Sequence, residues 1–125
     1  MHFVVSRYLA LLFAIGLAIG ETIISWGNWQ FAPLWIVDYL MVIWLLYAYS
    51  KTRRPENTYT LLAAWAFAVG VFYMDLFVYA DPQVPAHVRP APVVMSLIVL
   101  CLAVSLIGCV TALFAARAQR GSNQS

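Results

Sequence analysis

Four long hydrophobic stretches follow one another along the chain, with short polar segments between them. They cover about residues 5–26, 34–50, 58–80 and 91–117. At a rise of 1.5 Å per helical residue, such stretches can cross a hydrocarbon layer about 30 Å thick. Short connections favour antiparallel packing of consecutive helices. The pattern predicts an all-α fold, a four-helix transmembrane bundle that forms one domain over residues 1–117. A polar C-terminal tail, 118–125, should be disordered.

Composition agrees with a membrane location. Of the 125 residues, 64% are hydrophobic and only 10% are charged, and the mean hydropathy is +0.84. A water-soluble domain of this size has too little interior to bury so much apolar surface. We therefore expect an integral membrane protein surrounded by the lipid bilayer, in the bacterial inner (plasma) membrane. Because the polar segments contain no basic patch with interleaved aromatic residues, we expect no nucleic-acid partner.

The basic residues predict the orientation of the bundle. With four spans, all Lys and Arg residues except Arg89 fall on the side of the two termini. Loops rich in Lys and Arg face the cytoplasm in membrane proteins. Both termini should therefore be cytoplasmic. The residues on that side are Arg7, Lys51, Arg53, Arg54, Arg117 and Arg120.

Three acidic residues, Glu21, Asp38 and Asp75, interrupt stretches that carry almost no other charge. Each lies four or five residues from the outer end of its predicted helix, which places all three roughly 6–8 Å below the outer boundary. Carboxyl groups are costly inside a bilayer and mostly face a partner, a cavity or a ligand. The sequence therefore predicts one layer of acids, from three helices, near the outer mouth of the bundle.

Small residues indicate where two of these acids point. Glu21 and Asp75 each share a helix face with alanines, and small residues mark the faces where membrane helices pack closely. We therefore expect both acids to point into the bundle. The face of Asp38 is bulkier, so its direction stays open. The alanines are Ala10, Ala14 and Ala18 for Glu21, and Ala64 and Ala68 for Asp75.

Three interpretations of the acidic layer are open. The acids can pair with Arg89, or with Trp and Tyr donors, and hold the bundle or a partner subunit in register. They can bind a cation, either an organic one against aromatic side chains or a metal ion with help from His87. They can also transfer protons in an enzyme that acts on a lipophilic substrate, but no catalytic motif accompanies them. The candidates for ligand or proton binding are Glu21, Asp38, Asp75, Tyr39, Tyr73, Trp26, Trp35 and Arg89; those for a metal are His87 and the three acids.

The segment Gly16-Leu-Ala-Ile-Gly20 predicts a close helix contact, either inside the bundle or with another chain. Four short helices enclose little volume, which favours a protein that acts with partners. The first hypothesis is therefore an accessory subunit of a membrane complex, or a component that self-associates through the Gly16/Gly20 face. The alternative is a proton- or cation-coupled binding or transport protein, and a membrane enzyme is third. The sequence identifies no cofactor and no catalytic residue.

Overall fold

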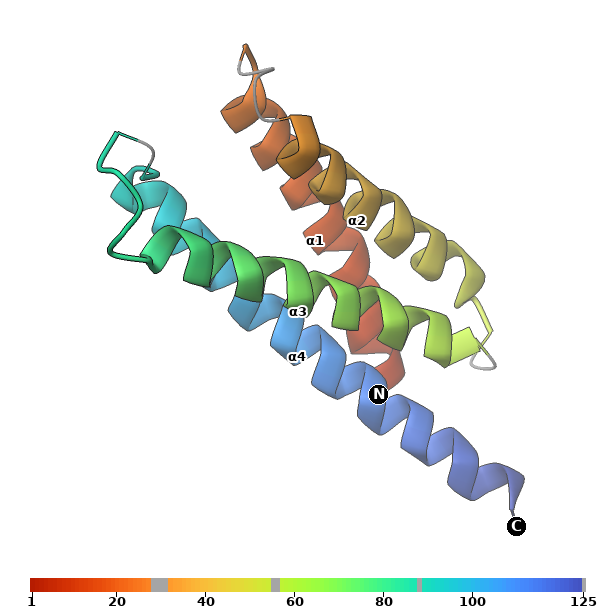
Figure 1. The fold of residues 1–125 in the computed structure, drawn as a ribbon. Helices are drawn as coiled ribbons and strands as arrows, with labels where there is room; N and C mark the ends of the chain where they lie inside the picture. The colour runs from red at the N-terminus through yellow and green to blue at the C-terminus, as the bar shows by residue number, and fades with distance from the viewer. Residues whose placement is uncertain (28–31, 55–56, 88, 125) are drawn as a thin grey trace.

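The chain folds into four α-helices that run in alternating directions (Figure 1). The computed structural model describes residues 1–27, 32–54, 57–87 and 89–124. Both termini and the α2–α3 connection lie at one end of the bundle, and the α1–α2 and α3–α4 connections lie at the other (Figure 1). The helices are α1 (His2–Ser25), α2 (Ala32–Lys51), α3 (Thr58–Ala80) and α4 (Pro92–Asn123).

The predicted ranges of the first three helices agree with the structure to within a few residues. The fourth helix starts at Pro92, where a first-turn proline is tolerated. It then continues well beyond its predicted end, as far as Asn123. The prediction of a disordered tail is therefore wrong over 118–123. The reason is local, because the segment 115–120 is rich in Ala, Arg and Gln, which favour helix even where the chain is polar.

Three of the four helices are long and apolar enough to cross a membrane. They are His2–Ile24 within α1, Thr58–Ala80, and Pro92–Asn123. α2 has 20 residues, which is sufficient length for a span, but it carries Asp38 and ends at Lys51. Its passage through the membrane stays a prediction.

The helices form two hairpins, α1–α2 and α3–α4. α1 packs against α2 and α4, and α3 packs against α4 and α2, so that α1 and α3 lie diagonally across the bundle. Alanines line the contacts, and Ala10, Ala14, Ala64 and Ala68 are almost completely buried. The predicted small-residue faces of α1 and α3 do point into the bundle.

The half of the bundle that contains the termini, here called the terminal half, joins three helices through a buried hydrogen-bonded contact. Trp65 of α3 donates from Nε1 to Ser6 Oγ of α1 at 3.0 Å, and Ser6 Oγ donates to the carbonyl oxygen of Gly108 in α4 at 3.1 Å. The Trp65 and Ser6 side chains are fully buried. Gly108 lies against the indole so closely that a Cβ there would overlap the ring.

Arg7 ties α1 to α2 in the same half. Its Nε donates to the carbonyl oxygen of Tyr49 at 3.2 Å, and its guanidinium lies 4.3 Å from the centroid of the Tyr49 ring. The aromatic ring stabilises the guanidinium cation, and the carbonyl oxygen accepts a hydrogen bond from it. All four helices are thus connected in the terminal half, by side-chain contacts that satisfy their polar groups.

Candidate functional site

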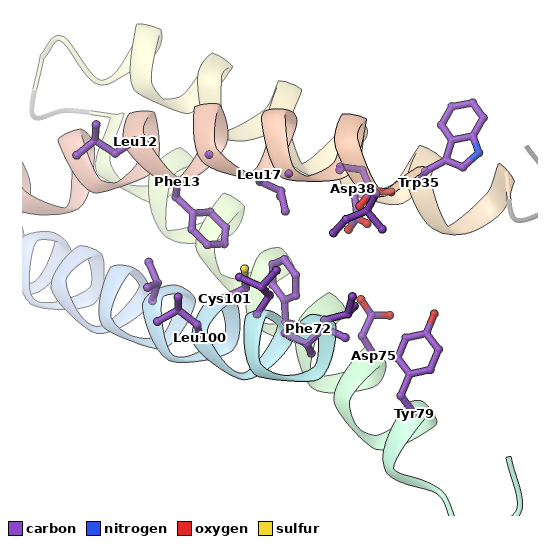
Figure 2. A pocket seen from close by; sticks show the side chains of 18 residues that line it. Leu12, Phe13, Leu17, Trp35, Asp38, Phe72, Asp75, Tyr79, Leu100 and Cys101 are labelled. Atoms are coloured by element: carbon purple, nitrogen blue, oxygen red, sulfur yellow. The ribbon is translucent and has the colours of Figure 1, made fainter. Parts of the chain in front are cut away.

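A cavity of about 480 Å³ lies between the two hairpins in the other half of the molecule, here called the cavity half (Figure 2). The three acids of the hydrophobic stretches line it: Glu21 from α1, Asp38 from α2 and Asp75 from α3. α4 completes the wall with apolar residues and Cys101. The structure therefore brings together the three carboxyl groups that the sequence predicted to converge.

Polar and apolar groups are separated along the length of this cavity. Asp38, Asp75 and Tyr79 gather toward one end, and Phe13 and Leu100 lie toward the other (Figure 2). The acidic end is the end nearer the α1–α2 and α3–α4 connections, since Glu21 and Asp75 belong to the last turns of α1 and α3. The cavity consequently has a charged mouth and a hydrophobic interior.

The three acids interact with one another. The carboxyl groups of Glu21 and Asp38 lie close enough to interact, and Asp75 is close enough to both to interact electrostatically. Asp38 Oδ1 is buried and has no hydrogen-bond partner among the described residues. A buried oxygen without a hydrogen bond destabilises the protein, and a ligand that donates a hydrogen bond to it would remove that cost.

Among the described residues that line the cavity there is no Lys, Arg or His. Arg89, predicted as a possible partner of the acids, is held by its own loop between α3 and α4. Its Nε donates to the carbonyl oxygen of Val84 at 3.0 Å, and its Nη2 donates to that of Pro82 at 2.9 Å. His87 lies exposed in the same loop and does not line the cavity.

Of the four aromatic residues predicted to form a wall, Trp35 lines the cavity. Trp26 is 80% exposed and lies outside it. Tyr39 instead links α2 to α1, because its hydroxyl is hydrogen-bonded to Thr22 Oγ1 at 2.7 Å. Tyr73 is more than half exposed and packs against Phe77. These three side chains therefore do not contribute to the cavity.

Other aromatic residues provide the wall that the sequence analysis missed. They are Phe13 of α1 with Phe72 and Tyr79 of α3, and the rings of Phe13 and Phe72 meet edge to face at 5.8 Å. Helical spacing was the available signal. Phe72 and Tyr79 lie three residues before and four residues after Asp75, on the same face of α3.

The metal interpretation finds no support in the geometry. Within the part of the chain that the structure describes, no group of three His, Cys, Asp or Glu side chains is arranged to hold a metal ion. The acids share a cavity, but they do not form the set of several oxygen ligands at about 2.0–2.6 Å that a hard cation requires. An extended ligand suits this arrangement better than a point charge.

Asp38 and Asp75 also border a second, shallower hollow on the opposite side, between α2 and α3. Gly70, Tyr73 and Met74 belong to its lining. The two acids thus separate the main cavity from this hollow. This is where the structure places Tyr73, on the far side of the acids from the cavity.

The two glycines of the predicted helix contact line the main cavity. A Cβ placed at Gly16 or Gly20 would meet nothing within 4 Å among the described residues. A close contact through this face inside the chain is therefore not observed. The glycines instead widen the space between α1 and α4.

Comparison of the chain with models of known protein families, with curated proteins and with solved structures finds no match. A fold by itself does not specify a function. The side chains around the cavity carry the chemical information that a function requires, and they include three carboxyl groups, aromatic rings and aliphatic walls.

Proposed function

We propose that the chain is an integral membrane protein that binds an organic cation in the acidic cavity. The observation that supports this proposal is that carboxyl groups from three helices surround one cavity. The described residues that line this cavity include no cationic side chain. A volume of about 480 Å³ lies within the usual range of small-molecule sites, roughly 300–1,000 Å³. Aromatic rings beside the acids add cation–π attraction.

The membrane setting is supported by the surface of the bundle. Large apolar side chains are exposed along the helices, among them Ile23, Val93 and Leu12. Each would be unfavourable in water by about 25 cal/mol per Å² of apolar area, and is at no disadvantage against lipid chains. In this proposal all four helices cross the bilayer. The excess of Lys and Arg at the terminal half favours a cytoplasmic location for both termini, and a bacterial inner membrane is the expected location.

A bound cation would also supply the positive charge that the described residues lining the cavity lack. An isolated charge is expensive in a low-dielectric interior, and a bound cation offsets that cost. When no ligand is present, protonation of the acids can take the place of a bound cation. Binding of a cation then competes with protonation, which agrees with a proton-coupled binding or transport protein.

A role as an accessory subunit is the second candidate, and the open space at Gly16 and Gly20 favours it. A helix of another chain can approach a glycine face closely. These glycines line the cavity, so a partner helix seated there would cover the same opening. The two candidates consequently make opposite predictions for the purified protein, because one requires a small cation and the other a second chain.

The test is direct binding of tetraphenylphosphonium to the purified protein in lipid nanodiscs. We expect saturable binding that weakens at least tenfold in Asp38→Asn and that competes with protons. Asp81→Asn is the matched control, because Asp81 is an exposed acid of the α3–α4 loop that bonds to the Gln83 amide. Midpoints of thermal unfolding should show that both variants are folded. Absence of saturable binding between about pH 5 and 8 would refute the proposed function.

A further inference from the structure

The main cavity reaches the side of the bundle between α1 and α4. Lining residues from both helices are also exposed at the surface: Leu12 of α1 is 67% exposed, and Leu97 and Leu100 of α4 are 42% and 57% exposed. Gly16 and Gly20 present no side chain at this place. In a membrane this face meets the lipid chains, so the cavity is accessible from within the bilayer.

The apolar part of the cavity is long. Its lining on α1 extends from Glu21 to Leu12, nine residues or about 14 Å along the helix axis. The lining on α4 extends from Val94 to Val104, about 15 Å. Between these limits the walls are almost entirely apolar, and Phe13 and Leu17 of α1 point toward α4 (Figure 2).

Charge is confined to one end of this length. The acids occupy the end nearer the predicted outer surface, where the polar heads of the outer leaflet begin, and the apolar walls extend toward the middle of the bilayer. A lipid-like molecule has the same distribution, with a polar head at the surface and a chain pointing inward. The cavity is therefore complementary to an amphiphile whose head is positive.

On this basis we infer that the ligand of the proposed cation site is a single-chain amphiphilic amine or alkylammonium that enters sideways from the outer leaflet, between α1 and α4. The inference rests on the proposed function and adds the class of ligand and its route. The head lies among Glu21, Asp38 and Asp75, and the hydrocarbon chain lies along the α1–α4 gap. No covalent bond to the ligand forms. When the cation enters, a protonated acid loses its proton to water, and the resulting carboxylate neutralises the cation.

The experiment uses an alkyltrimethylammonium probe with a photoreactive diazirine on its tail, added to the full-length protein in nanodiscs. After illumination, mass spectrometry identifies the labelled residues. We expect labels on α1 and α4, at Leu12, Leu97 or Leu100, which an excess of the unlabelled amphiphile suppresses. Asp38→Asn should reduce this labelling at least tenfold.

Filling the side opening tests the route. In Gly16→Leu combined with Gly20→Leu, each new Cβ meets nothing within 4 Å, and the longer side chains are intended to occupy the space between α1 and α4. We expect labelling to fall at least tenfold, while the midpoint of thermal unfolding does not decrease. Gly70→Leu is the matched control, because this glycine also has open space but lies on the α2–α3 side. It should label like the unmodified protein.

The outcomes separate the two proposals. If tetraphenylphosphonium binds in an Asp38-dependent manner but the tail labels α2 and α3, the lateral route is wrong and the cation site stands. The same conclusion follows if Gly70→Leu, and not the double variant, blocks labelling. If tetraphenylphosphonium does not bind at all, both proposals fail. Labelling that Asp38→Asn leaves unchanged also overturns the inference, because the probe then occupies lipid-facing grooves without using the acids.

Discussion

The two halves of the bundle use polar side chains in opposite ways. In the terminal half, Ser6, Trp65 and Gly108 connect α1, α3 and α4 across the boundary between the hairpins, and every polar atom in that contact is hydrogen-bonded. In the cavity half, the three acids line an open space, and Asp38 Oδ1 has no partner among the described residues.

The hydrogen bonds that do form in the cavity half stay within one hairpin. Tyr39 and Thr22 join α1 to α2, and Arg89 is held inside the α3–α4 loop. Closely packed, satisfied interiors specify one arrangement, whereas partly satisfied polar groups are typical of functional sites. The terminal half therefore holds the two hairpins together, and the cavity half leaves room between them for a ligand.

Among the substitutions that test this comparison, Gly108→Ala should cause the largest loss of stability. The added methyl group would overlap the Trp65 ring, which is fully buried and cannot move freely. Overpacking of this kind costs about 1–3 kcal/mol of unfolding free energy. The measurement is the midpoint of thermal unfolding in detergent. The control is Gly70→Ala, where the new Cβ meets nothing within 4 Å and should leave the midpoint unchanged or slightly higher. Equal midpoints for the two variants would mean that the terminal half is not the tightly packed one.

A smaller loss of stability should follow from Trp65→Phe. The substitution removes the Nε1 donor but leaves Ser6 able to donate to the Gly108 carbonyl. Loss of one buried hydrogen bond costs about 1 kcal/mol, to which a modest packing loss is added. Trp44→Phe is the control, because Trp44 is 40% exposed and packs against Phe67 at the surface. Should the Trp44 variant lose more stability than the Trp65 variant, the proposed role of the Ser6–Trp65–Gly108 contact would be wrong.

The smallest loss of stability should come from Tyr39→Phe in the cavity half. Thr22 donates its hydroxyl proton to the Ala18 carbonyl at 2.7 Å, so Tyr39 is the donor in its bond to Thr22. The bond lies at the surface of the bundle and within one hairpin, and we expect its loss to cost less than about 0.5 kcal/mol. Tetraphenylphosphonium affinity should change less than twofold, because Tyr39 does not line the cavity. A tenfold loss of affinity would show that the separation of the two hairpins depends on this bond.

Most of the fold and the position of the acids could be predicted from the sequence. Hydrophobic length and the prolines predicted the helices, and helical spacing predicted that Glu21 and Asp75 share buried alanine faces. The distance of each acid from the end of its helix was predictable, because each helical residue adds the same rise. The convergence of the acids therefore followed from local rules applied to three helices separately.

Contacts between helices were less predictable, because the sequence alone does not specify which neighbour a face meets. Trp44 and Trp65 both interrupt apolar stretches, yet one is largely exposed and the other is fully buried. The Gly16/Gly20 pair predicted a close contact, and the structure shows open space at both positions. A glycine permits close approach but does not require it, and the rotation and tilt of neighbouring helices decide the outcome.

Asp38 and Asp75 belong to the linings of both the α1–α4 cavity and the α2–α3 hollow. At this level the same two acidic side chains border both spaces. Two monovalent cations, one in the cavity and one in the hollow, would interact with the same two carboxyl groups. A cation bound in one space would therefore lower the affinity of the other space for a second cation, without any movement of a helix.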